Sequence, residues 1–262
     1  MCPSWLPRLL RLLGLKGSER VPLTAGILII GSLLWDEERQ TWRGARLDMG
    51  SAETVTAPIR YGRLSGWRRG RTYTMVFSRL CEAGQARVVR CSHIISSADE
   101  LIEEAEHLWK AEQPNAEAGR IAADWGCVGL LCNPERKIPE DLLKGWANRV
   151  ANEPGYGNVP QIQKEGCLVS NDGLLHIPWP RMVEGGATVR LDLLLATANH
   201  PTLTGTPPSY PSVETVCCAW NAAGGNHVEY FWRNVENGIL TFQDDAIRKQ
   251  LRPRAHPPHD PQ

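Results

Sequence analysis

Two segments of the sequence carry residues that could do chemistry: a glycine turn at Ile30–Leu34 and a single glutamate, Glu112. The run Ala25–Ile30 is continuously apolar, which predicts a buried strand, and Gly31 follows it directly. A glycine there lets the backbone approach a ligand, and consecutive N–H groups in such a turn can bind an anionic oxygen. The alternative is a tight turn that only ends the strand, which is the more frequent case.

Glu112 ends a segment, beginning at Ser97, that predicts a helix. Ser97 and Glu100 have the spacing of a capping box, and Leu101 and Leu108 recur at helical spacing on one apolar face. Glu112 falls on that face, so we expect its carboxylate to point towards the core. Desolvation would raise its pKa and make it a candidate general acid/base. The alternative is a charged helix end paired with an arginine, the commoner case.

Most of the other acidic residues of this segment are predicted on its solvated face. They are Glu100, Glu103, Glu104 and Glu106.

Alternation of polar and apolar residues, with glycines between the apolar runs, predicts several more strands. Two helices are predicted near the carboxyl end, and a third, earlier in the chain, begins at Pro139. The expected strands cover 57–64, 72–77, 86–95 and 124–132, the helices cover 139–150, 226–235 and 244–251, and 188–196 is a strand or short helix.

These elements predict an α+β fold with a mixed, barrel-like sheet from about Gly26 to Leu131 and flanking helices. We expect a leader over 1–24, either disordered or a packing helix, and a core over 25–150. A C-terminal extension over 151–251 packs on that core, and a disordered tail covers 252–262.

Composition excludes several classes of protein. The chain of 262 residues is 42% hydrophobic and carries 29 basic and 29 acidic residues, so no net charge attracts nucleic acid, and nucleic-acid binding is disfavoured. The arginines around Trp67–Arg71 could dock phosphates, but a hairpin turn with solvated arginines is the favoured interpretation. The segment Trp5–Leu15 is too short and too charged to span a bilayer, so we expect no transmembrane segment.

The cysteines and histidines indicate no metal site. The 8 cysteines lack the spacing of a zinc site or a disulfide scaffold, and the 7 histidines lack metalloenzyme motifs. We therefore expect reduced thiols, a cytoplasmic location and no bound metal.

Taken together, the two segments resemble the gamma-glutamylcyclotransferase-like family, most closely its ChaC-type branch. The resemblance rests on Gly31-Ser-Leu-Leu-Trp35, the arginine-rich strands of 59–78, the glutamate Glu112 and the stretch Gly225–Tyr230. It implies release of 5-oxoproline from a gamma-glutamyl compound, with Glu112 as general acid/base and no cofactor. The oligomeric state stays open.

The resemblance and the sequence pattern together give a set of expected substrate-binding residues. A loop rich in turn formers, residues 152–158, could cover the pocket and bring Tyr156 to the ligand, although an ordinary connection is equally consistent with it. The expected substrate contacts are Ile30, Gly31, Ser32, Leu33, Leu34, Arg63 and Tyr156.

Two positions depart from the family pattern. Ile30 stands where the family usually has Tyr, which removes an aromatic ring and a hydroxyl from the pocket, and Ala111 stands where the ChaC-type pattern has Arg. These departures imply a changed substrate or a lost activity. The alternative function is therefore a non-catalytic module that keeps the cavity to sense a ligand or bind a partner.

Overall fold

The computed structural model describes residues 22–66, 70–156, 168–223 and 225–251. The leader prediction for residues 1–21, the tail prediction for 252–262 and part of the arginine-rich hairpin, 67–69, lie outside the described residues. The elements in chain order are β1 Leu23–Ile29, η1 Ser32–Leu34, η2 Glu37–Arg39, α2 Gln40–Arg46, β2 Leu47–Ala57, β3 Ile59–Leu64, β4 Tyr73–Phe77, β5 Gly84–Ile95, α3 Ala98–Glu112, β6 Ala122–Ala123, β7 Gly126–Cys132, α4 Glu140–Ala151, β8 Leu193–Asn199, α5 Val213–Ala223, α6 Gly225–Glu236 and α7 Asp244–Gln250.

The described strands form an open six-stranded sheet in the order β2-β5-β1-β8-β7-β6 and a separate pair, β3-β4. β1 and β8 run parallel and the other neighbours are antiparallel, so the predicted α+β class and mixed sheet are confirmed. The sheet is not a closed barrel, because β3 and β4 pair with each other and do not join β2 to β6. The barrel-like closure expected from the sequence is therefore corrected to an open sheet.

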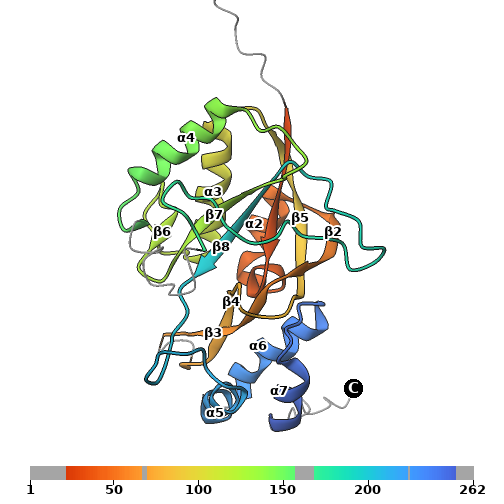
Figure 1. Ribbon diagram of the computed structural model, residues 1–262, viewed down its shortest axis with the longest axis vertical. Helices are drawn as coiled ribbons and strands as arrows, with labels where there is room; N and C mark the ends of the chain where they lie inside the picture. The colour runs from red at the N-terminus through yellow and green to blue at the C-terminus, as the bar shows by residue number, and fades with distance from the viewer. Residues whose placement is uncertain (1–21, 67–69, 157–167, 224, 252–262) are drawn as a thin grey trace, which may run out of the picture.

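The centre of the sheet is apolar on both faces, as parallel neighbours require. Every residue of β1 except Thr24 is buried, and so is every residue of β8 except Asn199. Helix α3 packs against β7 and β8, and α4 packs against α3 (Figure 1). This packing holds the end of α3 over the end of β1 and β8, where the candidate site lies.

One predicted strand, 57–64, is divided in the structure. β2 ends at Ala57, β3 begins at Ile59, and Pro58 stands between them. Proline has no N–H to donate to a sheet, which explains the break. The charged stretch 36–46, for which we predicted no element, folds into η2 and α2.

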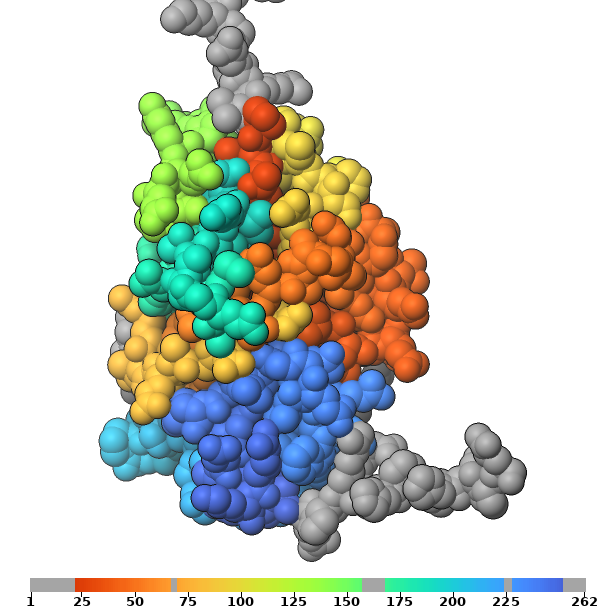
Figure 2. Space-filling view, turned by 90° about the vertical axis from the view of Figure 1, so that its right-hand side faces the viewer, coloured from red at the N-terminus to blue at the C-terminus, as the bar shows by residue number. Residues whose placement is uncertain are grey.

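The stretch 151–251 is not only an addition packed on the core, because it also supplies β8 between β1 and β7. Its three helices, α5, α6 and α7, gather at one end of the molecule beside β3 (Figure 1), where Figure 2 shows them as one blue block. Helices α6 and α7 lie where the sequence predicts them, whereas α5 was not predicted. No helix in the described part of the chain is long and apolar enough to cross a membrane.

Candidate active site

Helix α3 carries Glu112 to the edge of a cavity. The Ser97 hydroxyl accepts a hydrogen bond from the Glu100 N–H at 3.2 Å, as the capping pattern predicts. The Glu100 carboxylate accepts one from the N–H of Ser96 rather than of Ser97, so the two side chains still fix the helix start. Leu101 and Leu108 are fully buried. Glu112 is the last residue of the helix and is half-buried, with its side chain at the cavity wall.

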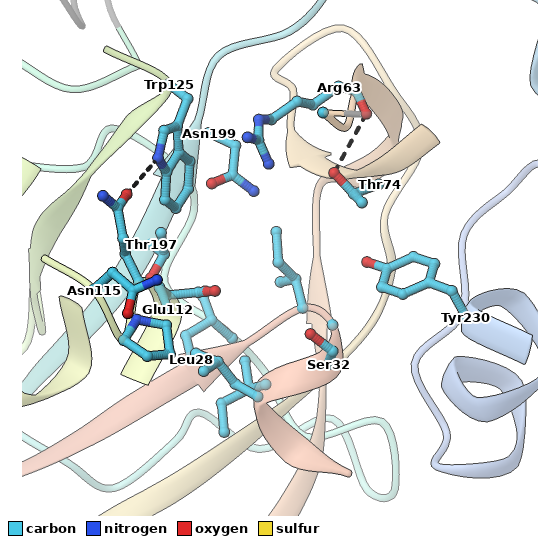
Figure 3. A pocket seen from close by; sticks show the side chains of 17 residues that line it. Leu28, Ser32, Arg63, Thr74, Glu112, Asn115, Trp125, Thr197, Asn199 and Tyr230 are labelled. Atoms are coloured by element: carbon cyan, nitrogen blue, oxygen red, sulfur yellow. Dashed lines mark hydrogen bonds between the residues drawn. The ribbon is translucent and has the colours of Figure 1, made fainter. Parts of the chain in front are cut away.

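The cavity has a volume of about 590 Å³ and is lined by segments that are far apart in the sequence. The turn after β1, the end of α3, the hairpin β3–β4, β8 and α6 all contribute to it (Figure 3). Its lining residues are Leu28, Ile29, Ile30, Gly31, Ser32, Leu33, Arg63, Gly66, Thr74, Glu112, Gln113, Pro114, Asn115, Trp125, Thr197, Asn199 and Tyr230.

The turn after β1 lies across this cavity from Glu112. The Leu34 N–H donates to the Gly31 carbonyl at 3.2 Å, which begins the short helix η1. The N–H groups that precede it, those of Ser32 and Leu33, have no partner inside such a turn. Both residues line the cavity, so these backbone donors can bind an anionic or carbonyl oxygen of a ligand.

Gly31 is needed for space rather than for its backbone angle. Its φ is −177°, an extended conformation that any residue adopts. A Cβ atom there would lie 2.8 Å from the Tyr230 hydroxyl. The glycine therefore lets a tyrosine approach the turn, an arrangement the sequence did not predict.

Tyr230, on α6, is a cavity residue that the sequence analysis quoted only as part of a matching stretch. Its hydroxyl accepts a hydrogen bond from the Met75 N–H at 3.4 Å, and its ring meets Trp35 edge-on with ring centroids 5.9 Å apart. Trp35 in turn donates its indole N–H to Asn234 at 2.8 Å. Tyr230 thus joins α6 to the turn after β1. The short Gly225–Tyr230 match was the available signal for it.

Arg63 lies at the other side of the cavity, where it stacks on Trp125. The guanidinium carbon is 4.4 Å from the centre of the Trp125 ring. Trp125 is itself held by Trp109, with ring centroids 4.7 Å apart, and by Gln113, which accepts its indole N–H at 2.7 Å. The predicted contact residue Arg63 therefore shares one cavity with Glu112 and the turn.

Two further side chains of the cavity come from β8, and the sequence analysis did not select them. Thr197 and Asn199 are two apart on the strand, so they face the same side of the sheet. The Asn199 amide N–H donates to the Met75 carbonyl at 3.2 Å. The Thr197 hydroxyl oxygen and the Asn199 side-chain carbonyl oxygen are buried without a hydrogen-bond partner. Both residues line the cavity, but these two oxygen atoms are themselves turned into the packed interior.

Two of the predicted contact residues do not line the cavity. Tyr156 is 1% exposed, and its hydroxyl donates to the Val128 carbonyl at 2.7 Å. Burial raises its pKa well above the usual range, which fits a core residue. Leu34 is half-buried outside the cavity. The structure thus brings together Ile30, Gly31, Ser32, Leu33, Arg63 and Glu112 and leaves Leu34 and Tyr156 out.

Helix α3 also holds a second acid, Glu104, which is 3% exposed although the sequence indicates a solvated face. Arg46 donates two hydrogen bonds to its carboxylate. Burial lowers the pKa of Arg46, but the hydrogen bond and charge of Glu104 outweigh burial and raise it overall. Glu104 is therefore engaged by an arginine and does not line the cavity.

Three of the described thiols are poor nucleophiles at neutral pH. Burial raises their pKa, to about 12 for Cys91 and about 11 for Cys132 and Cys217. Within the described ranges, no group of three or more His, Cys, Asp or Glu side chains could hold a metal ion.

Comparisons of this chain with protein-family models, with curated proteins and with solved structures found no match.

Proposed function

We propose that this chain is a gamma-glutamyl cyclotransferase-like enzyme that releases 5-oxoproline from a gamma-glutamyl compound. The observation that carries the proposal is the cavity that has Glu112 on one wall and the backbone turn Ile30–Leu33 on another (Figure 3). These two segments are also among the four stretches on which the sequence resemblance to the ChaC-type branch rests.

In the proposed reaction the free α-amine of the substrate attacks its own γ-carbonyl carbon. A C–N bond forms and closes a five-membered lactam, and the original amide C–N bond breaks to release an amine. Starting from the α-ammonium, the attacking nitrogen gives up two protons and the departing nitrogen gains two. The Glu112 carboxylate accepts protons from the first nitrogen and returns them to the second, so the reaction balances without water or a cofactor.

The backbone turn binds the substrate, and the cavity holds it in a folded conformation. The N–H groups of Ser32 and Leu33 bind substrate oxygens and stabilise negative charge on the tetrahedral intermediate. Because the attack is intramolecular, holding the substrate in a folded conformation contributes much of the remaining rate.

Tyr230 compensates for the departure from the family pattern at Ile30. The resemblance implies that Ile30 removes an aromatic ring and a hydroxyl from the pocket, but Tyr230 brings both to the cavity from α6, with its hydroxyl next to Gly31. This supports retained activity over a lost one.

The test is an assay for 5-oxoproline, by mass spectrometry, with gamma-glutamyl dipeptides, glutathione and gamma-glutamyl amines as substrates. We expect release by the wild-type protein and a fall of about 10²- to 10⁴-fold in Glu112→Gln, the range for loss of a general acid/base. Glu103→Gln is the matched control, because it removes the same charge from an exposed side chain of the same helix.

Two results would contradict the proposal. One is equal activity in Glu112→Gln and the wild type. The other is no 5-oxoproline from any substrate, which together with retained binding of a gamma-glutamyl compound would favour the non-catalytic sensing module.

A further inference from the structure

The turn after β1 is fixed from outside the cavity by an arginine that the proposed cyclisation does not use. Arg43, on α2, donates two hydrogen bonds from its Nη1 atom, one to the Leu33 carbonyl at 2.9 Å and one to the Asp36 carbonyl at 2.8 Å. Arg43 is half-buried and does not line the cavity, so it contacts the turn from the side away from a ligand. It thereby ties the turn to the start of η2, for which Asp36 is the N-cap.

One hydrogen bond within this segment sets the direction of the Leu33 N–H. The Asp36 N–H donates to the Ser32 carbonyl at 2.8 Å. The peptide bond between Ser32 and Leu33 is trans, so its N–H points in the direction opposite to that carbonyl. The orientation of the Leu33 N–H therefore depends on where Asp36 lies. Arg43 fixes that position, because one guanidinium nitrogen holds the carbonyls of Leu33 and Asp36 together.

Helix α6 holds the same segment through a different residue. It packs against η1, and its buried Asn234 accepts the indole N–H of Trp35 at 2.8 Å. Figure 3 shows Tyr230, of the same helix, on the same side of the cavity as Ser32. Loss of the Arg43 side chain therefore leaves the segment attached to α6, and we expect its effect to be confined to the turn.

The positive charge of Arg43 strengthens its contacts with the turn. Burial lowers the pKa of Arg43, with Arg39 adding to the fall and Asp36 opposing it, but a guanidinium remains charged at neutral pH. Hydrogen bonds from a charged donor are about twice as strong as those between neutral groups. Arg46, on the same helix, donates to the carboxylate of Glu104 instead, so the two arginines have different partners.

We propose that Arg43 is a positioning residue for the cyclisation, which holds the turn so that its backbone donors are already aimed when negative charge develops on the substrate oxygen. This inference rests on the proposed function. Arg43 acts through the backbone and does not touch the substrate. Donors fixed in advance stabilise an oxyanion more than a neutral carbonyl, so a loosened turn lowers kcat more than it weakens substrate binding.

The experiment measures the turn and the reaction separately. Amide hydrogen exchange, followed by mass spectrometry in the wild type and in Arg43→Met, reports how firmly residues 31–36 are held. We expect exchange in this stretch to be about tenfold faster in the variant, which loses two charge-assisted hydrogen bonds, and unchanged in β1. For 5-oxoproline release from gamma-glutamylalanine we expect kcat to fall by about 10- to 100-fold, the cost of misplacing groups that meet the transition state, and KM to change less.

Arg46→Met is the matched control, because it removes the same kind of side chain from the same helix without touching the turn. Measured below its unfolding temperature, it should leave kcat and the exchange of residues 31–36 as they are in the wild type. Arg43→Lys keeps a charged donor, so its exchange rate and its kcat should lie between those of the wild type and Arg43→Met.

The outcomes separate this inference from the function on which it rests. An active enzyme whose kcat is unchanged in Arg43→Met overturns the inference, and so does an equal fall of kcat in Arg46→Met, which would show a loss of stability only. If Arg43→Met does not fold, Arg43→Lys decides, and wild-type values of both exchange and kcat in that variant overturn the inference. If exchange is faster in Arg43→Met but the wild type releases no 5-oxoproline from any gamma-glutamyl compound, the proposed function is wrong and the role in catalysis falls with it, although Arg43 does hold the turn.

Discussion

The middle of helix α3 and its C-terminal end each hold an acid in a different environment. Glu104, in the middle, is almost fully buried and accepts two hydrogen bonds from Arg46. Glu112, at the end, is half-buried and lines the cavity. Of these two carboxylates of one helix, the more deeply buried one is the structural residue, because its charge is matched by an arginine and no ligand can reach it.

Glu104 and Glu112 together show that burial alone does not identify a reactive acid. What distinguishes Glu112 is open space beside it and a turn of backbone donors on the far side of that space. We therefore expect that removing Glu104 lowers the stability of the fold, whereas removing Glu112 lowers the rate of the reaction.

The largest effect on stability is expected for Glu104→Ala. This change leaves the half-buried Arg46 with only the exposed Glu103 as a partner. We therefore expect a loss of about 3 kcal/mol of unfolding free energy, the lower end of the range for breaking a buried ion pair. Urea unfolding measures the loss. Glu112→Gln, in the same assay, should change the free energy of unfolding by about 1 kcal/mol or less, the cost of one altered hydrogen bond at a half-buried side chain. Similar losses of unfolding free energy in both variants would contradict this difference in role between Glu104 and Glu112.

A third acid, Asp244 at the start of α7, is buried like Glu104 but forms no ion pair with any of the described residues. Burial raises its pKa from 3.8 to about 6, with Asp245 adding to the rise and Thr241 and Arg248 opposing it. One of its carboxylate oxygens is buried without a hydrogen-bond partner. The folded state therefore holds this proton more tightly than the unfolded chain does.

The stability of the protein should consequently fall as the pH rises from about 4 to 6, through the window between the two pKa values. The full difference corresponds to about 3 kcal/mol above pH 6. Asp244→Asn keeps the acceptor for the Thr241 hydroxyl and has no charge to bury, so it should be more stable than the wild type at pH 7. Unfolding curves of both proteins at pH 4.5 and 7.5 check this, and a difference between them that does not change with pH would refute it.

The smallest effect is expected for Tyr230→Phe. This variant keeps the ring against Trp35 and removes the hydroxyl beside Gly31. Loss of one neutral hydrogen-bonding group costs about 1 kcal/mol, which corresponds to about a fivefold lower kcat/KM for 5-oxoproline release. An unchanged kcat/KM would remove Tyr230 from the proposed site. Circular dichroism serves as the control for folding.

Local patterns predicted the parts of the fold that depend on local interactions. The α3 helix begins and ends within one residue of its predicted bounds, since its cap and apolar face lie within the segment itself. The strand β8 was left ambiguous, because a short apolar run has no periodicity that separates a buried strand from a helix. Helix α5 was missed, although Ser212 accepts a hydrogen bond from the Thr215 N–H and so caps it.

The residues of the candidate site also fall into two groups, those that local patterns predict and those that long-range packing places. Glu112 and the turn at Gly31 were predicted, because each ends a regular element with a clear pattern. Thr197, Asn199 and Tyr230 were not, because they reach the cavity only through the pairing of β8 with β1 and the packing of α6. Tyr156 was placed at the pocket on loop composition alone, which carries no information about direction, and its hydroxyl binds the core strand β7 instead.

A crystal structure of Glu112→Gln with a bound gamma-glutamyl dipeptide tests the central claim most directly, since this variant should bind the substrate without cyclising it. We expect the gamma-glutamyl group on the turn at Gly31–Leu33, with its α-nitrogen within hydrogen-bond distance of the side chain at position 112. A dipeptide bound in the cavity with its α-nitrogen away from position 112, or bound outside the cavity, would contradict it.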